Sequence, residues 1–242
     1  MKPSINQAMN KDFIKKVEQD ALSANLYIVV LEESNRSISI PVGASGVIIG
    51  REGNTYYALT AKHVLKKAND DTTRVMVMAH NQPDYKAFLN KGGKYQGLNE
   101  YYAQFSEAQI EYANNQYDLA VISFQTNENY AVLPIATEKP EYGDKVAAIS
   151  NQNGERNVVT AGKISSRKPS LFGDEEGKHQ FPIIKHTALL TAGSSGSALL
   201  NENLEIVGIN LGGKENVFHT FIAGMAMPSD RIHAFIDEWQ NQ

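Results

Sequence analysis

The stretch TAGSSGSALL, from Thr191 to Leu200, places three serines within four positions, with two glycines between and around them and an apolar run behind. A tight turn before a strand is one explanation for so many small residues. The other is a nucleophile, in which one serine stands exposed while nearby backbone N–H groups point at the group it attacks. The choice depends on whether the rest of the chain supplies a base and a carboxylate.

Composition limits what kind of protein this can be. The chain has 242 residues, enough for one large domain or two small ones, with 42% apolar and 21% charged residues, as in packed globular proteins. Its formal charge is −4 and it has no block of Lys and Arg, which argues against a nucleic-acid partner. The absence of cysteine excludes disulfides, cysteine-based zinc sites and thiol catalysis.

The N-terminal sequence lacks the apolar core of a signal peptide, and no later run is long enough to span a bilayer. We therefore expect a cytoplasmic protein that does not bind a membrane, unless the chain is cut from a longer precursor. No histidine pair is spaced for a metal, and no metal or other cofactor is expected. The oligomeric state is left open.

The first half of the chain predicts a helix followed by strands. Ser4 can cap a helix over residues 4–24, in which Phe13, Ile14 and Val17 begin an apolar stripe. After Asn25 the pattern changes to short runs rich in Val, Ile, Tyr and Thr. The strands expected in this group are 26–32, 37–42, 45–50, 55–61, 74–80, 108–113 and 118–124. A tyrosine-rich segment at 94–105 is expected to be a surface excursion that packs its own rings.

The second half repeats this organisation in reverse, with strands before a helix. The strands expected here are 145–151, 157–168, 181–189, 197–201, 205–211 and 221–227, and residues 228–239 are predicted to form a closing helix. Two groups of about six short strands suggest two β-barrels in an all-β fold. The predicted division is an N-terminal helical segment (1–24), a first barrel (25–127), a linker (128–142) and a second barrel with the C-terminal helix (143–242).

A histidine and an aspartate have the settings that a serine nucleophile needs. His63 follows the predicted strand TYYALTA, and Asp118 stands at the start of the apolar run DLAVISF, where a carboxylate is costly without a partner. A nucleophilic serine needs a base in hydrogen-bond reach, and the base needs a carboxylate on its other nitrogen. Each motif has a plain structural explanation by itself, such as a turn cap or a satisfied polar residue. Their joint occurrence favours the catalytic interpretation.

The stretches LTAKHV, YDLAVI and GSSGSAL resemble the three signature segments of the chymotrypsin-like (trypsin-like) serine proteases. The later IVGINLGG and AGMAMPSDRIHAFI are similar to bacterial HtrA-type proteases and glutamyl endopeptidases. The resemblance implies two six-stranded β-barrels, a serine endopeptidase acting on protein or peptide substrates, and catalysis by Ser195, His63 and Asp118 through an acyl-enzyme. It also implies an oxyanion hole made by the nitrogens of Gly193 and Ser195. The alternative is a catalytically silent protein-binding module on the same fold.

The same resemblance implies a specificity pocket. Its base would lie near Leu189 and Leu190, and its walls would be formed by Asn210, Leu211 and Gly212 and by Gly224, Met225 and Ala226. Trypsin-like enzymes need an acidic group at the base, and glutamyl endopeptidases use a Ser or Thr five residues before the nucleophile and a His fifteen after it. Those two places hold Leu190 and Asn210 in this chain. A small or medium apolar P1 residue is therefore expected, rather than Arg, Lys or Glu, with Asn210 allowing a neutral polar one.

Two further expectations concern neighbours of the nucleophile. The residue before Ser195 is Ser194, whereas digestive members of the family carry there an aspartate that pairs with a new N-terminus. The chain is therefore expected to need no N-terminal cleavage. His186 and His219 are expected near the cleft as further candidates to touch substrate.

Overall fold

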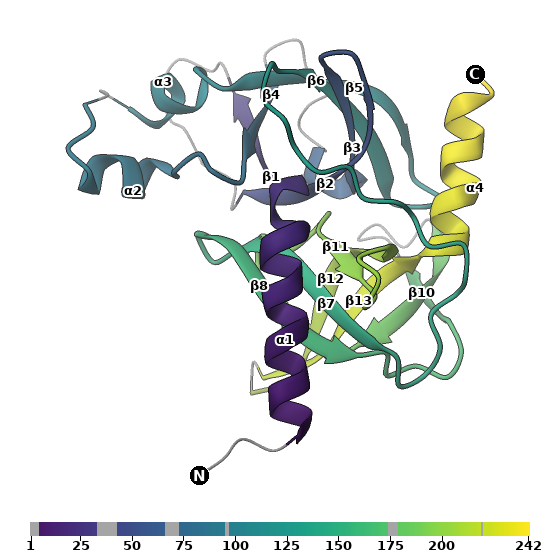
Figure 1. Cartoon of the computed structure of the whole chain (residues 1–242). Helices are drawn as coiled ribbons and strands as arrows, with labels where there is room; N and C mark the ends of the chain where they lie inside the picture. The colour runs from purple at the N-terminus through teal and green to yellow at the C-terminus, as the bar shows by residue number, and fades with distance from the viewer. Residues whose placement is uncertain (1–4, 33–42, 66–72, 95–96, 174–178, 219) are drawn as a thin grey trace.

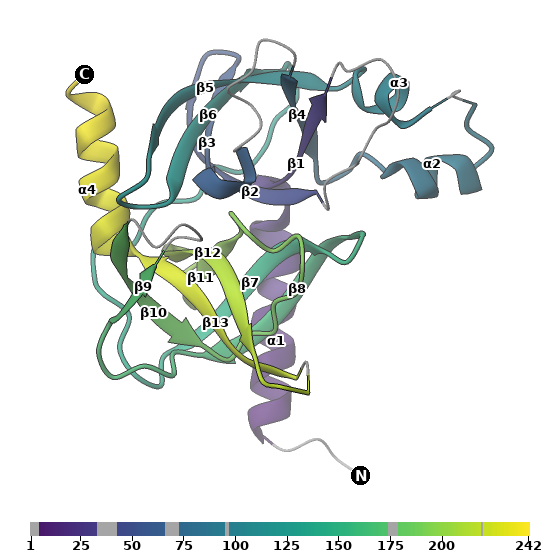
Figure 2. The same cartoon turned by 180° about the vertical axis from the view of Figure 1, so that it is seen from behind.

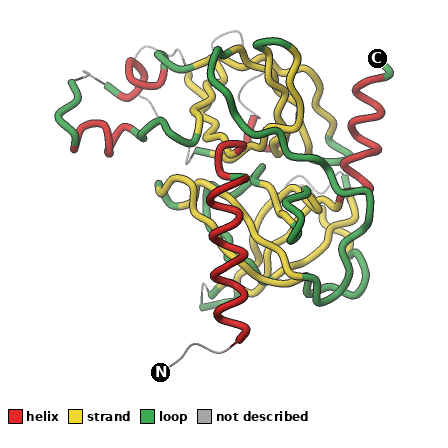
Figure 3. The backbone as a smooth tube through the Cα atoms, in the orientation of Figure 1, coloured by secondary structure: helices red, strands yellow, loops and turns green. Residues whose placement is uncertain are grey.

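The computed structural model describes residues 5–32, 43–65, 73–94, 97–173, 179–218 and 220–242. Its strands form a closed barrel from the first half of the chain and a separate sheet from the second half, drawn below the barrel in Figure 1. The view from behind gives the same arrangement (Figure 2). Long helices stand at the two ends of the chain, and almost all of the rest is strand or loop (Figure 3). The expected cap Ser4 and the expected strand at 37–42 lie outside the described residues.

Six antiparallel strands close the first barrel in the order β1-β2-β3-β6-β5-β4. They are β1 (Asn25–Glu32), β2 (Ala44–Glu52), β3 (Thr55–Ala61), β4 (Thr73–Ala79), β5 (Ser106–Asn114) and β6 (Leu119–Gln125). Each of these strands was predicted within two residues at either end, because its apolar run stops at a turn. β6 is buried from Leu119 to Phe124, as a continuous apolar run predicts.

Seven strands form the second sheet, in the order β8-β7-β11-β12-β13-β10-β9. They are β7 (Lys145–Gln152), β8 (Glu155–Lys163), β9 (Ser170–Gly173), β10 (Gln180–His186), β11 (Ala198–Leu200), β12 (Ile206–Glu215) and β13 (Phe221–Pro228). Six strands were predicted. The extra one is β9, because the strand expected at 157–168 ends at Lys163 and the chain pairs again with β10. An isolated antiparallel bridge joins Ile164 to His186, so β8 and β10 approach each other there. Closure of this sheet into a barrel stays a prediction.

Helix α1 (Ile5–Asp20) lies against β7 and β8 and buries Phe13 and Val17. It ends at Asp20 rather than at residue 24, and a short 3-10 helix, η1 (Leu22–Ala24), leads into β1. No helix within the described part of the chain has the length and apolar character needed to cross a membrane.

Helix α4 (Ser229–Gln240) connects the two strand groups. It contacts β12 and β13, and it stacks two of its aromatic rings on the barrel. Phe235 lies 5.1 Å from the ring of Tyr112, and Trp239 lies 5.5 Å from the ring of Tyr57. The apolar face that the sequence predicted for this helix is therefore covered.

Two short helices, α2 (Tyr85–Asn90) and α3 (Leu98–Tyr102), were not predicted as helices, because each is too short to show a helical period. The rings of Tyr101 and Tyr102 lie 5.3 Å apart, and Tyr102 lies 6.4 Å from Tyr27 of β1. The tyrosine-rich excursion thus packs its own rings, as expected, and also covers the outer face of the barrel.

Candidate active site

His63 and Asp118 follow and precede two strands that pair with each other. Ala61, the last residue of β3, lies opposite Leu119, the first residue of β6. Residues just after β3 and just before β6 therefore lie at the same end of the barrel. His63 is held there by the short 3-10 helix η2 (Lys62–Leu65).

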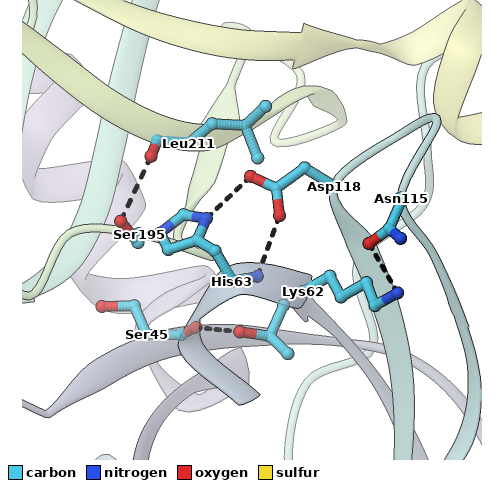
Figure 4. A network of polar contacts seen from close by, with 8 residues as sticks. Ser45, Lys62, His63, Asn115, Asp118, Ser195 and Leu211 are labelled. Carbon is cyan, nitrogen blue, oxygen red and sulfur yellow. Dashed lines mark hydrogen bonds and ion pairs between the residues drawn. The ribbon is translucent and has the colours of Figure 1, made fainter. Parts of the chain in front are cut away.

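Two contacts join Asp118 to His63 (Figure 4). Oδ2 of Asp118 lies 2.7 Å from Nδ1 of His63, and Oδ1 accepts a hydrogen bond from the backbone N–H of His63 at 2.8 Å. Because an ionised carboxylate only accepts, Nδ1 carries the proton and Nε2 is left as an acceptor. The side chains are 27% and 15% exposed, so the imidazole is open on one side while the carboxylate is largely enclosed.

The backbone of Asp118 has a left-handed conformation, with φ of 49°, which is uncommon outside glycine. Its carbonyl oxygen accepts a hydrogen bond from the N–H of Lys62 at 2.9 Å. The ammonium of Lys62 in turn donates to Oδ1 of Asn115 at 2.6 Å (Figure 4). Strained backbone of this kind persists where its surroundings hold it, and functional sites are where it clusters. Here it turns the carboxylate toward His63.

Ser195 lies in the loop before β11, beside the imidazole of His63 in Figure 4. Its hydroxyl donates to the backbone carbonyl of Leu211 at 3.2 Å. No hydrogen bond joins Ser195 to His63 within the described residues. The structure therefore joins the imidazole and the carboxylate of the predicted group, whereas the serine side chain is turned toward β12 rather than toward the base.

Two glycines explain the composition of the GSSGS turn. Gly193 and Gly196 have φ of +95° and +85°, which L side chains rarely adopt. A Cβ on Gly196 would lie 2.1 Å from the carbonyl oxygen of Ser45, and one on Gly193 would lie 2.3 Å from that of Asn151. The turn therefore packs too closely on β2 and β7 for any side chain at these two positions.

The peptide that joins Ala192 to Gly193 has a fixed direction. The carbonyl oxygen of Ala192 accepts a hydrogen bond from the N–H of Asn153 at 2.8 Å. In a trans peptide the N–H points opposite to the carbonyl, so the N–H of Gly193 points away from Asn153. Neither this N–H nor that of Ser195 donates a hydrogen bond within the described residues. Two free backbone donors thus flank Ser194 in the nucleophile turn.

The predicted pocket residues come before and after this turn in the chain. Leu189 is 46% exposed, whereas the others are more enclosed. Leu190, Asn210, Leu211, Gly224, Met225 and Ala226 are buried, and Gly212 is half-buried. The amide of Asn210 is occupied on both sides, with Oδ1 2.8 Å from Nε2 of His186 and Nδ2 donating to Oγ of Ser197 at 2.9 Å. It is therefore not available to a polar substrate side chain.

His186 is fully buried, which contradicts the expectation that it touches substrate. Burial lowers its pKa to about 4, so the ring is neutral at pH 7. Its strand partner Gly224 makes room for the ring, since a Cβ there would lie 2.1 Å from it. His219, the other histidine expected near the cleft, lies outside the described residues.

The described residues contain no group of three or more His, Asp or Glu side chains arranged to hold a metal ion. Three residues that contact the nucleophile turn, Ser45, Asn151 and Asn153, were not predicted from the sequence, and neither was Arg156, which bonds to Asn151. The pair Asn153–Gly154 was a usable signal, because Asn-Gly predicts a two-residue hairpin turn. The contact of Asn151 with Ser45 joins residues 106 positions apart, which no local pattern reveals.

The family model and the relatives that match this chain all describe peptidases. The family model described as "Trypsin-like peptidase domain" matches residues 44–209. The chain is 25% identical over 209 residues to the glutamyl endopeptidase of Staphylococcus aureus (strain MRSA252), which covers 83% of this chain and 51% of that protein. The glutamyl endopeptidase of strain MW2 matches equally, at 25% identity over 209 residues, with 56% of that protein covered. The chain thus spans about half the length of these curated relatives.

Among solved structures, the fold is similar to the serine endoprotease from Yersinia pestis. The TM-score is 0.63 at 26% sequence identity, and the match covers 93% of this chain and 66% of that one. The similarity therefore extends over both the barrel and the second sheet.

Proposed function

Because this chain belongs to the family of trypsin-like peptidase domains, we propose that it is a serine endopeptidase in which Ser195, His63 and Asp118 are the catalytic residues. The observation that carries the proposal is the double contact of Asp118 with His63, which leaves Nε2 of the imidazole as a base beside Ser195. No cofactor is needed for this chemistry.

The reaction begins when the hydroxyl of Ser195 leaves the carbonyl of Leu211 and turns to Nε2 of His63. Oγ attacks the scissile carbonyl carbon while Nε2 takes the hydroxyl proton. The N–H groups of Gly193 and Ser195 stabilise the oxyanion that forms. His63 then gives the proton to the leaving amine, and the acyl group stays on Oγ. Water then attacks the acyl carbon and gives one proton to Nε2. His63 returns that proton to Oγ as the bond between Oγ and the acyl carbon breaks, which releases the carboxylic acid and restores the hydroxyl of Ser195.

Substrate would bind as an added strand along β12. β12 pairs with β11 only up to Ile209 and then continues to Glu215 with β13 as its partner. The edge of β12 that begins at Leu211 can therefore accept an extended peptide, whose backbone would hydrogen-bond to it. The carbonyl of Leu211, now bound by Ser195, lies at the start of this edge.

The substrate residue at P1 is proposed to be apolar. The relatives are glutamyl endopeptidases by name, but this chain offers no matching polar group at the predicted pocket. Leu190 is apolar, Asn210 is already bonded on both sides, and His186 is buried. A glutamate side chain would therefore lose its hydration without gaining a partner.

A fluorophosphonate probe, which phosphonylates activated serines, tests the proposal on the intact chain, with the N-terminus checked by mass spectrometry. Wild type should label without prior cleavage, and Ser195→Ala should not label at all. Ser106→Ala is the matched control, since the Ser106 hydroxyl also donates to a backbone carbonyl, that of Gln125 at 3.2 Å. Full labelling of Ser195→Ala would refute the proposed function. A peptide library that gave strong preference for Glu, Arg or Lys at P1 would refute the proposed specificity.

A further inference from the structure

Arg156, near the start of β8, is half-buried and bonds to the first barrel across the boundary between the two strand groups. Its Nη1 and Nη2 donate to the carbonyl oxygens of Gln82 and Ala79, both at 2.9 Å. The guanidinium lies 4.8 Å from the ring centre of Tyr27. Burial lowers the pKa of Arg156, whereas Tyr27 and Asp84 oppose this, and a guanidinium stays charged in any case. A charge that has lost part of its hydration in this way is stabilised by the acceptors around it.

The third donor of Arg156 reaches Asn151. Nε donates to Oδ1 of Asn151 at 3.0 Å, and the same oxygen accepts from the backbone N–H of Asn157 at 3.2 Å and from Nδ2 of Asn25 at 3.3 Å. The amide nitrogen of Asn151 donates to the carbonyl oxygen of Leu26 at 2.9 Å. Asn151 is therefore fixed at both ends of its amide, and Arg156 supplies the only charged donor among these bonds.

Asn151 in turn fixes Ser45, which touches the nucleophile turn. The backbone N–H of Asn151 donates to Oγ of Ser45 at 2.9 Å, and that hydroxyl donates to the carbonyl oxygen of Gly193 at 2.9 Å. The preceding peptide is held from the same hairpin, because the N–H of Asn153 donates to the carbonyl of Ala192 at 2.8 Å. Both peptide planes that flank Gly193 are thus held by groups next to Asn151.

We propose that Arg156 is a positioning residue for catalysis: through Asn151 and Ser45 it holds the peptides on either side of Gly193 so that the Gly193 N–H stays aimed at the oxyanion. This inference rests on the proposed function, since it concerns the same site. A backbone donor in an oxyanion hole acts only if it is already oriented when charge develops. Arg156 supplies that orientation from the far side of the hairpin, without touching substrate.

The test measures the maximum rate and the half-saturating concentration of fluorophosphonate inactivation at a temperature where every variant is folded. Arg156→Gln should lower the maximum rate about tenfold to a hundredfold and leave the half-saturating concentration nearly unchanged, as a partial loss of one oxyanion-hole donor would. The matched control is Arg51→Gln. Arg51 also lies over a tyrosine ring, 4.9 Å from that of Tyr56, and bonds to a carbonyl, that of Gly53, but it does so on the exposed side of the barrel.

Two further variants separate positioning from stability. Arg156→Lys keeps the charge over Tyr27 but has no donor in place of Nε, so it should recover thermal stability more fully than rate. Ser45→Ala removes the hydroxyl between Asn151 and Gly193 and should slow inactivation by a similar factor. If the two residues act along one path, Ser45→Ala combined with Arg156→Gln should lose little more than the larger single loss.

The outcomes are distinguishable. Absence of labelling in wild type would refute the proposed function and this inference with it. Normal labelling of wild type, with Arg156→Gln lowering the melting temperature alone, would overturn the inference and leave the function standing. Losses that multiply in the double variant would also overturn it, because they would place Arg156 and Ser45 on separate paths.

Discussion

The two halves of the candidate site differ in how far they are assembled. On the barrel, His63 and Asp118 are joined by two contacts, and Asp118 is also held through its carbonyl oxygen by the backbone N–H of Lys62. On the second sheet, the backbone of the nucleophile turn is arranged, but the hydroxyl of Ser195 donates to Leu211 instead of to His63. The proposed mechanism therefore requires the hydroxyl of Ser195 to exchange its hydrogen bond to Leu211 for one to His63, whereas the contact between His63 and Asp118 is already made.

The two halves also differ in the kinds of polar group that form them. The barrel half depends on a carboxylate paired with an imidazole, whereas the half on the sheet depends on backbone N–H groups and neutral amides such as Asn210 and Asn151. Changes to the carboxylate or the imidazole should therefore act mainly on proton transfer. Changes around the turn should act mainly on oxyanion binding and on stability.

Asp118→Asn should have the largest effect. An amide NH₂ placed where the carboxylate accepts would force the proton of His63 onto Nε2, which could then no longer accept the proton of Ser195. We expect kcat to fall about 10⁴-fold with little change in KM. Asp144→Asn is the control, because Asp144 also accepts a backbone N–H, that of Glu141 at 2.7 Å, but lies away from the site. A loss below tenfold would show that the barrel half works without the carboxylate of Asp118.

Gly193→Ala should come next. The new Cβ would lie 2.3 Å from the carbonyl oxygen of Asn151, so the turn must shift and its N–H with it. We expect kcat to fall about 10²- to 10³-fold, as for loss of one oxyanion-hole donor. Gly143→Ala isolates the backbone effect, since Gly143 has the same φ of +95° with nothing within 4 Å of its added Cβ. Equal kinetics for Gly193→Ala and Gly143→Ala would contradict the proposal that the Gly193 N–H is part of the oxyanion hole.

In both halves, short stretches of sequence mark the candidate site residues. The strands that carry His63 and Asp118 have clear apolar runs, and both residues stand at strand ends where a polar side chain needs a reason. The turn around Ser195 is marked by glycines that only positive φ explains. The candidate site residues could therefore be identified from short stretches of sequence and from the family resemblance.

The directions of side chains and the polar contacts between distant residues could not be predicted from the sequence. Nothing local distinguishes Arg156 from a surface arginine, because two of its three acceptors are far away in the sequence: Ala79 of β4 is 77 positions away and Gln82, in the loop after β4, is 74. The same holds for the turn of Ser195 toward Leu211 and for the burial of His186 against Asn210. These depend on how the barrel and the sheet meet, which apolar periodicity does not encode.

His186→Gln tests whether the half on the sheet is uncharged. Its pKa is about 4 in the fold against an ordinary value of 6.5, so the unfolded chain binds more protons between these values. The contribution of neutral His186 to the free energy of unfolding is therefore fully present above pH 6.5. It falls by roughly 3 kcal/mol as the pH drops to about 4. Urea unfolding across this window should show the slope in wild type and lose it in the variant, whose amide can still donate to Asn210.

His233→Gln serves as the control for that slope. Nε2 of His233 lies 3.1 Å from the carbonyl oxygen of Ala136 and away from Asn210, so the slope should persist in this variant. Persistence of the slope in His186→Gln as well would assign it to another group.

The smallest expected effect is that of changing Glu238 of α4. Its carboxylate accepts hydrogen bonds from the hydroxyls of Tyr117 and Tyr112 at 2.6 and 3.0 Å and from Nδ2 of Asn114 at 3.0 Å, so it bonds to the residue before Asp118. The bond from Tyr117 does most to lower the pKa of Glu238. A lowered pKa in the fold means that the ionised form contributes stability above the ordinary value of 4.5, and that this contribution is lost as the pH falls through the lowered value. Because this carboxylate lies at the surface, Glu238→Gln should flatten the acid limb of urea unfolding only slightly.

Activity should change even less in this variant. Asp118 is already held by the N–H groups of His63 and Lys62, so kcat/KM of Glu238→Gln should stay within about threefold of wild type, the scale of a surface ion pair. Glu202→Gln, which breaks the exposed pair with Lys145 at 2.9 Å, sets the background for such a change. A tenfold loss confined to Glu238→Gln would mean that α4, rather than the pairing of β3 with β6, sets the direction of the Asp118 carboxylate. The barrel half would then be as dependent on distant support as the turn around Ser195.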